Sequence, residues 1–150
     1  MALRRATPDD APELVRLRRV MYDAMEVDHS SPGWAESCER VLRESLASGV
    51  MAAFVVDDGD GRLRACGVGM VEQRLPGPRT PNGRHGYVQS MATEPDARRQ
   101  GHAKVIFAAL LDWFAEQGVT AIDLHATDAG ARIYRTFGFN EPRHVTLGRR

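Results

Sequence analysis

The chain of 150 residues has two cysteines, a single lysine and no long apolar run. Cys38 and Cys66 lack a Cys-x-x-Cys spacing and are too few for a disulfide framework, so we expect free thiols in a reducing cytoplasm. The N-terminal residues lack the apolar core of a signal peptide, and no segment reaches the length of a membrane span. The formal net charge is zero, which gives no reason to expect nucleic acid as a partner.

Metal-binding patterns are also missing. The five histidines are dispersed, and none stands in a His-Glu-x-x-His or similar spacing, so we expect no metal centre. The length suits one domain, residues 1–150, with an ordinary buried core.

The apolar pattern predicts an α/β domain with one mixed, mostly antiparallel sheet flanked by helices. The turn at 57–61 makes its two neighbours a hairpin, and the helical crossover between Thr93 and Ala121 predicts at least one parallel pair. The expected helices are 11–25, 34–48, 105–117 and 129–137. The expected strands are 3–6, 51–56, 63–73, 87–93, 121–125 and a last one that opens at Phe139 and includes 145–147.

The most informative stretch is 86–104, which reads GYVQSMATEPDARRQGHAK. It predicts a strand, a tight basic loop and a helix N-terminus. Two arginines at the positive end of a helix dipole are unfavourable unless an anion binds there. Gly101 allows the backbone to approach such an anion closely. We therefore predict a site for a pyrophosphate.

Two common nucleotide-binding motifs are absent. The P-loop ends in Lys-Ser or Lys-Thr, whereas Lys104 is followed by Val105. Gly67-Val68-Gly69 lacks the third glycine of the dinucleotide fingerprint and continues as a strand. We interpret these glycines as sites of close approach or of a bulge.

Segment 98–103, RRQGHA, resembles the [RQ]-x-x-G-x-[GA] acyl-CoA loop of the GCN5-related N-acetyltransferase (GNAT) family. Segment 91–95 is similar to that family's fourth strand and its exit, and 130–139 to its A-x-x-L-Y-x-x-x-G-F segment. The order and separation of these segments make the resemblance specific. Two positions depart from the family pattern, because Thr127 replaces a frequent asparagine and Gly130 a frequent alanine.

The resemblance implies the acyl-CoA N-acyltransferase fold and an N-acetyltransferase. Such an enzyme moves the acetyl group of acetyl-CoA directly to a primary amine of a small molecule or peptide. The family also includes many homodimers, and that state stays open here.

The resemblance further implies roles for individual residues. Loop amides with Lys104 would hold the pyrophosphate, and the backbone of Met91 and Thr93 would pair with pantetheine as an added strand. Tyr134 would protonate the leaving thiolate; from helical spacing alone, a boundary tyrosine with a satisfied hydroxyl is the simpler interpretation. The expected acetyl-CoA-binding residues are Met91, Ala92, Thr93, Arg98, Arg99, Gln100, Gly101, His102, Ala103, Lys104, Thr127 and Tyr134.

The general base and the acceptor pocket follow less directly. The attacking amine must be neutral, so a carboxylate or a histidine should lie near it. Glu72 is the first choice, although an exposed strand-end charge explains it equally well; Glu26, Asp28 and His29 come next. The expected acceptor-pocket residues are Tyr22, Met25, Glu26, His29, Trp34 and Gln89, while core packing equally explains Tyr22, Met25 and Trp34.

Two alternatives to this function stay open. A non-catalytic acyl-CoA-binding or regulatory module would share the fold but release no thiol with any amine. An acyltransferase could instead use a longer acyl-CoA or a carrier-protein thioester, and the small residues Ala92 and Ala126 do not settle the size of the donor.

Overall fold

The computed structural model describes residues 1–144 and 146–150. Within them, one five-stranded sheet has the order β1-β2-β3-β4-β5, antiparallel except for the parallel pair β4–β5. The strands are β1 (Ala2–Arg5), β2 (Met51–Asp57), β3 (Leu63–Gln73), β4 (Arg84–Thr93) and β5 (Ala121–Leu124). The helices are α1 (Ala11–Ala24), α2 (Trp34–Ser48), α3 (His102–Glu116) and α4 (Asp128–Thr136), with 3₁₀ turns η1 (Pro8–Asp10) and η2 (Pro95–Ala97). The predicted mixed, mostly antiparallel sheet is confirmed.

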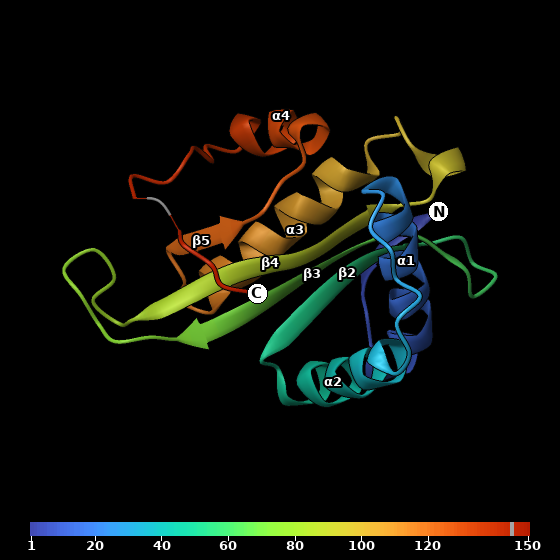
Figure 1. Cartoon of the computed structure of the whole chain (residues 1–150), viewed down its shortest axis with the longest axis horizontal. Coiled ribbons are helices and arrows are strands. Elements are labelled where there is room, and N and C mark those ends of the chain that lie inside the picture. Colours follow the sequence, from blue (N-terminus) through green and yellow to red (C-terminus); the bar gives the residue numbers. More distant parts are fainter. Residues whose placement is uncertain (145) are drawn as a thin grey trace.

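Helices cover both faces of the sheet. Figure 1 shows α1 and α2 on one side and α3 on the other. Alternate residues of β2 divide between the two cores, with Ala53 and Val55 facing α1 and α2, and Ala52 and Val56 facing α3. This explains the continuous apolar run of β2, because a strand covered on both faces has no polar side.

Glycines in β3 let α3 approach the sheet closely. A Cβ atom at Gly67 would lie 2.6 Å from Ile106 Cγ2, and one at Gly69 would lie 2.8 Å from Phe114 Cζ. Both separations are shorter than side chains allow. The prediction of close approach at these glycines is therefore confirmed.

Three sequence-based assignments need correction, the first being the start of β4, which lies at Arg84 rather than Tyr87. Helix α3 begins at His102 rather than Val105, because Gly101 takes the left-handed conformation (φ +81°) that ends the loop. The final strand expected from Phe139 was wrong for residues 139–144 and 146–150, which form no strand; Val145 lies outside the described residues. Phe139 packs against Phe107 of α3, with ring centroids 5.3 Å apart, and Pro142 cannot donate to a strand ladder.

No helix within residues 1–144 and 146–150 combines the length and the hydropathy needed to span a bilayer.

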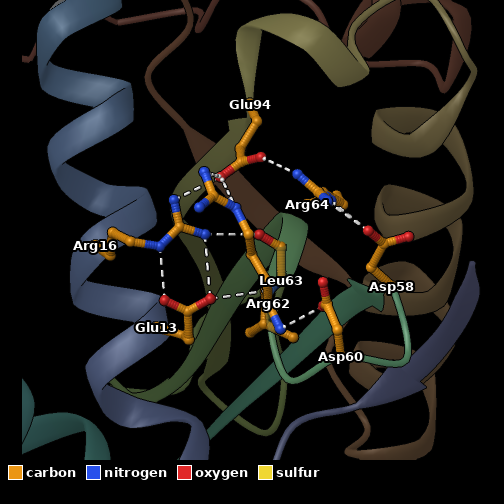
Figure 2. A network of polar contacts seen from close by, with 8 residues as sticks. All are labelled: Glu13, Arg16, Asp58, Asp60, Arg62, Leu63, Arg64 and Glu94. Atoms are coloured by element: carbon orange, nitrogen blue, oxygen red, sulfur yellow. Dashed lines mark hydrogen bonds and ion pairs between the residues drawn. The ribbon is translucent and has the colours of Figure 1, made fainter.

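Glu94, the residue that follows β4, is a buried carboxylate held by three arginines (Figure 2). Its side chain is 3% exposed. Oε1 accepts from Arg16 Nη1 at 2.6 Å and from Arg62 Nη2 at 2.8 Å, and Oε2 accepts from Arg64 Nη1 at 2.9 Å. Burial raises the pKa of Glu94, but hydrogen bonds from Arg62, Arg64 and Arg16 outweigh it and leave the pKa below its usual value.

The same network joins three elements that are distant in sequence. Arg16 of α1 also donates to Glu13 Oε2 at 2.6 Å and to the carbonyl oxygen of Leu63 at 2.8 Å. Leu63 opens β3, and Glu94 directly follows β4. The network therefore fixes α1 and the start of β3 to the exit of β4.

We expect Glu94→Gln to lower the free energy of unfolding by about 1–3 kcal/mol, because three arginines lose their shared carboxylate. The native pKa is depressed, so this stabilisation is complete above the unfolded pKa of about 4.3 and is lost as pH falls through the native pKa. The difference between wild type and variant, measured by urea denaturation, should thus shrink in acid.

Glu39→Gln is the matched control for Glu94→Gln. Glu39 lies 3.7 Å from Arg43, and both side chains are exposed, so the change should stay within about 0.5 kcal/mol of wild type. Equal stabilities for the two variants at neutral pH would contradict the role of Glu94.

Candidate active site

Strands β4 and β5 part before β4 ends. Their last paired residues are Val88 and Leu124, whereas β4 stays paired with β3 as far as Thr93. Residues 89–93 of β4 therefore have a strand partner on one side only, within the described part of the chain. The result is a gap in the sheet next to α3 and α4 (Figure 1).

A bulge lies at the point where the strands part. Val68 of β3 pairs with Ser90, but the next residue, Gly69, pairs with Val88, which leaves Gln89 as the additional residue of β4. Val88 packs in the α3 core, whereas Gln89 and Ser90 both line a cavity on the α1–α2 side. A bulge can direct two successive side chains to one face in this way.

The backbone beyond the bulge directs polar groups into the gap. The N–H of Glu94 donates to the carbonyl oxygen of Arg64 at 2.9 Å. Residues of an antiparallel strand alternate between facing their partner and facing away from it. The N–H and C=O groups of Ala92 therefore face β3, whereas those of Met91 and Thr93 point toward the gap.

The loop between η2 and α3 has the geometry of an anion site. Arg99 has φ +63° and Gly101 has φ +81°, and residues 98–101 are exposed. The first turn of α3 contains no acidic residue, and Gly101 offers no capping side chain. The free N–H groups and the positive end of the helix dipole thus stay available to an anion.

His102 opens α3 inside this loop. Its Nε2 atom is buried, and no described residue forms a hydrogen bond with it. Buried polar atoms are usually satisfied, so this nitrogen is consistent with a place beside a polar ligand.

Tyr134 of α4 lies on the α3 side of the sheet. Its ring is half-buried and packs on Phe107 with centroids 5.0 Å apart. Burial raises the pKa of the Tyr134 hydroxyl, which therefore stays protonated at neutral pH. None of the hydrogen bonds among the described residues uses this hydroxyl.

The two departures from the family pattern are structurally linked. Thr127 caps α4, since its Oγ1 accepts from the N–H of Gly130 at 3.1 Å. A Cβ atom at Gly130 would lie 3.3 Å from that oxygen and 3.5 Å from Tyr134 Cε2. Thr127 thus acts here as a helix cap, and Gly130 gives the cap room.

Two cavities lie on the α1–α2 side. The inner cavity, of about 380 Å³, is bounded by Arg18, Tyr22, Trp34, Cys38, Gln89 and Ser90, among others. The outer cavity, of about 560 Å³, is bounded by Arg19, Asp23, Asp28, His29, Trp34 and Glu36, among others. Trp34 lines both cavities and so separates them.

Stacked rings hold the wall between the cavities. Tyr22 and Trp34 pack edge to face at 5.6 Å, and His29 stacks on Tyr22 at 6.3 Å. Trp34 Nε1 donates to the carbonyl oxygen of His29 at 2.9 Å, and His29 Nε2 lies 2.6 Å from Asp23 Oδ1. Of the six predicted acceptor residues, the structure brings Tyr22, Trp34 and Gln89 to the inner cavity and His29 to the outer one, while exposed Met25 and Glu26 line neither.

Glu72 lies away from the gap. It pairs with Arg74, whose Nε is 3.1 Å from its Oε1, and its side chain is 46% exposed. It stands four positions after Val68, or about 13 Å along β3. Its role as the base stays a prediction.

Sequence reasoning missed Arg18, which lies in the inner cavity with its guanidinium 5.2 Å from the Tyr22 ring centroid. Its position four residues before Tyr22 on one helix was the available signal. Among the described residues, no group of three or more histidine, cysteine, aspartate or glutamate residues could hold a metal ion.

Comparison with known proteins identifies the class. Residues 14–139 match the family model described as Acetyltransferase (GNAT) family. The chain belongs to this family of acetyltransferases, which use acetyl-CoA as acyl donor, and the sequence-based identification is confirmed. No curated protein matches the chain.

Solved structures share the fold at low identity. A predicted acetyltransferase from Clostridium acetobutylicum, solved with acetyl-CoA, is 22% identical with a TM-score of 0.89, covering 98% of this chain and 95% of that one. A GCN5-related N-acetyltransferase from Ralstonia eutropha JMP134 is 23% identical with a TM-score of 0.82 over 98% and 97% of the chains. An aminoglycoside acetyltransferase from an uncultured soil metagenomic sample, solved with sisomicin, is 18% identical with a TM-score of 0.73 over 99% and 94%.

Changes in the loop should weaken CoA binding. Gly101→Asp adds a negative charge where the backbone would meet the pyrophosphate and strains a left-handed position, so we expect Kd to rise at least about tenfold. Arg98→Ala removes one exposed positive charge, and we expect a rise of about fivefold. Isothermal titration calorimetry with CoA measures both.

Arg79→Ala provides the control, because Arg79 is an exposed arginine in the β3–β4 connection, distant in sequence from this loop. Wild-type affinity in both loop variants would refute the pyrophosphate assignment.

Proposed function

We propose that this protein transfers the acetyl group of acetyl-CoA directly to a primary amine of a small molecule or peptide. One arrangement carries the proposal: a single gap in the sheet adjoins an anion-ready loop on the α3 side and a cavity on the α1–α2 side. Both substrates can then meet at the gap in a ternary complex, which makes positioning the main source of rate enhancement.

The donor is held by the loop and by β4. Backbone amides from Arg99 to Ala103, with Lys104, bind the pyrophosphate, and Arg98 adds positive charge. The free backbone groups of Met91 and Thr93 pair with the pantetheine arm as a further strand. One of these N–H groups polarises the thioester carbonyl. Gln100 and His102 lie along this path, and Ala92 connects Met91 with Thr93 while its side chain packs in the α1–α2 core.

The acceptor amine enters from the α1–α2 side. Tyr22, Trp34 and Gln89 wall the inner cavity, from which an amine can reach the bulge. Asp23, Asp28 and Glu36 around the outer cavity favour a cationic molecule. The aminoglycoside bound by one structural relative is an amine of this kind. Met25 and Glu26 directly follow α1 and line neither cavity, so their part in acceptor binding stays a prediction.

Tyr134 donates a proton to the departing thiolate. Its raised pKa keeps the proton on the hydroxyl until the sulfur becomes a strong base. Glu72, the base that sequence reasoning favoured, lies about 13 Å along β3 from Val68 at the bulge and would act on the amine through intervening waters.

A CoA-release assay tests the proposed function. Thiol release is followed with acetyl-CoA and a panel of amino acids, polyamines, aminoglycosides and peptide N-termini, and we expect release with at least one cationic amine. Tight CoA binding without release from any amine would instead identify a non-catalytic module. Release only from longer acyl-CoA donors would change the donor and keep the enzyme.

Tyr134→Phe should lower kcat by roughly tenfold to ten-thousandfold, the range for acid–base groups, in single-turnover experiments. Phenylalanine retains the packing on Phe107, so Tm and the Kd for CoA should match wild type. Because the pKa of Tyr134 is raised, wild-type kcat should show no loss from tyrosine ionisation below about pH 10.

Unchanged turnover in Tyr134→Phe, with chemistry rate-limiting, would remove Tyr134 from the mechanism.

A further inference from the structure

A tyrosine–histidine pair lies where β4 and β5 part. The hydroxyl of Tyr87, on β4, forms a hydrogen bond with Nδ1 of His125, the residue that follows β5. The two rings pack edge to face with centroids 5.7 Å apart. The pair lies beside Val88 and Leu124, the last residues that join the two strands.

Strand alternation places both side chains on the α1–α2 side. Val88 packs in the α3 core, and a Cβ atom at Gly86 would lie 2.7 Å from Phe114 of α3, so Tyr87 between them faces the opposite way. Ile122 and Leu124 of β5 also pack in the α3 core. His125 therefore shares its face with Tyr87, its hydrogen-bond partner.

This is the face from which the acceptor would reach the gap. Gln89, two residues after Tyr87, lines the inner cavity on the same face, and residues of one face are about 7 Å apart along a strand. His125 is exposed, so water and an incoming amine can both reach its ring.

We propose that His125 is the general base of acetyl transfer and that Tyr87 positions it. This role rests on the proposed function. The amine nitrogen forms a bond to the acyl carbon and gives its proton to Nε2 of His125. The C–S bond breaks, and the thiolate takes the proton of Tyr134. His125 then passes its proton to solvent, and Tyr134 regains one from solvent.

The hydrogen bond explains how the ring is held. Nδ1–H donates to the Tyr87 oxygen in the tautomer that leaves a lone pair on Nε2, which is the form a base requires. Tyr134 lies on the α3 side of the sheet and His125 on the α1–α2 side. The acid and the base thus stand on opposite faces of the gap, one toward the leaving sulfur and the other toward the amine.

Other candidates for the base are less well placed. None of the described residues lining the inner cavity has a carboxylate, and burial raises the pKa of the Cys38 thiol there. His29 pairs with Asp23 and lines the outer cavity. Two other titratable residues share the face of His125 and Tyr87. Asp123, on β5, lies two residues before His125, and His85 lies two residues before Tyr87 on β4.

Replacement of His125 provides the test. With the amine that gives the greatest CoA release in wild type, His125→Gln should lower kcat/KM by roughly a hundredfold to ten-thousandfold and leave the Kd for CoA unchanged. The rate of the variant should keep rising with pH where wild type has levelled off, because deprotonation of the amine in solution replaces the base. Added imidazole should restore part of the rate of His125→Ala.

Two further variants separate chemistry from structure. Tyr87→Phe should lower kcat less than His125→Gln, because it releases the ring without removing it. His85→Gln, on the same strand face but away from the gap, should match wild type.

Several outcomes would overturn the role of His125. These are wild-type kcat/KM in His125→Gln with chemistry rate-limiting, a loss that neither imidazole nor high pH relieves, or a loss found in Glu72→Gln instead. If none of the tested amines causes the wild-type protein to release CoA, the proposed function fails, and the role of His125 fails with it.

Discussion

The separation of β4 from β5 after Val88 is the constraint on which the site depends. A strand in the middle of a sheet normally satisfies both of its edges, and a bare edge is a liability that proteins manage by covering or pairing it. Here β4 leaves the backbone groups of Met91 and Thr93 facing a gap. The arrangement is best understood if an extended ligand completes the pairing, and the loop at the start of α3 lies at the end of the same strand.

A gap of this kind weakens the sheet, and the Glu94 network reinforces it at the adjacent corner. Arg16 comes from α1, Arg62 from the turn before β3 and Arg64 from β3, and one carboxylate fixes all three to the end of β4. Glu94 also begins the turn that leads into the basic loop. The network uses neither Arg98 nor Arg99, so the arginines of the loop stay available to an anion.

Helices and strands with a clear apolar pattern and clear end signals were predictable from the sequence. The bounds of α2 and β3 agree with those expected, because an apolar stripe with a terminal glycine and a strand between two turns leave little freedom. The basic loop was also recognised, because its charge contradicts the preference of a helix N-terminus. The last strand was wrong because apolar residues around Pro142 suggested pairing that a proline and an exposed tail do not sustain.

The residues on the acceptor side of the site could not be predicted from the sequence in the same way. A bulge adds one residue to a strand and so reverses the face to which every later side chain points. The sequence around Gln89 contains no signal that predicts this bulge. Glu72 was the first choice as a carboxylate near the end of a strand; the register pairs it with His85, and its side chain forms an ion pair with Arg74, which the sequence did not indicate. Tyr87 and His125 are 38 residues apart, and only the parallel pairing of β4 with β5 brings them together.

The cap of α4 has a consequence for how this sequence can change. Thr127 and Gly130 depend on each other, since a methyl group at 130 would lie only 3.3 Å from the threonine oxygen, whereas its contact with the ring of Tyr134, at 3.5 Å, would be an ordinary one. Alanine at 130 would gain helix propensity of about 1 kcal/mol but crowd the threonine oxygen that caps α4. A substitution at one of these two positions therefore alters which residues are acceptable at the other.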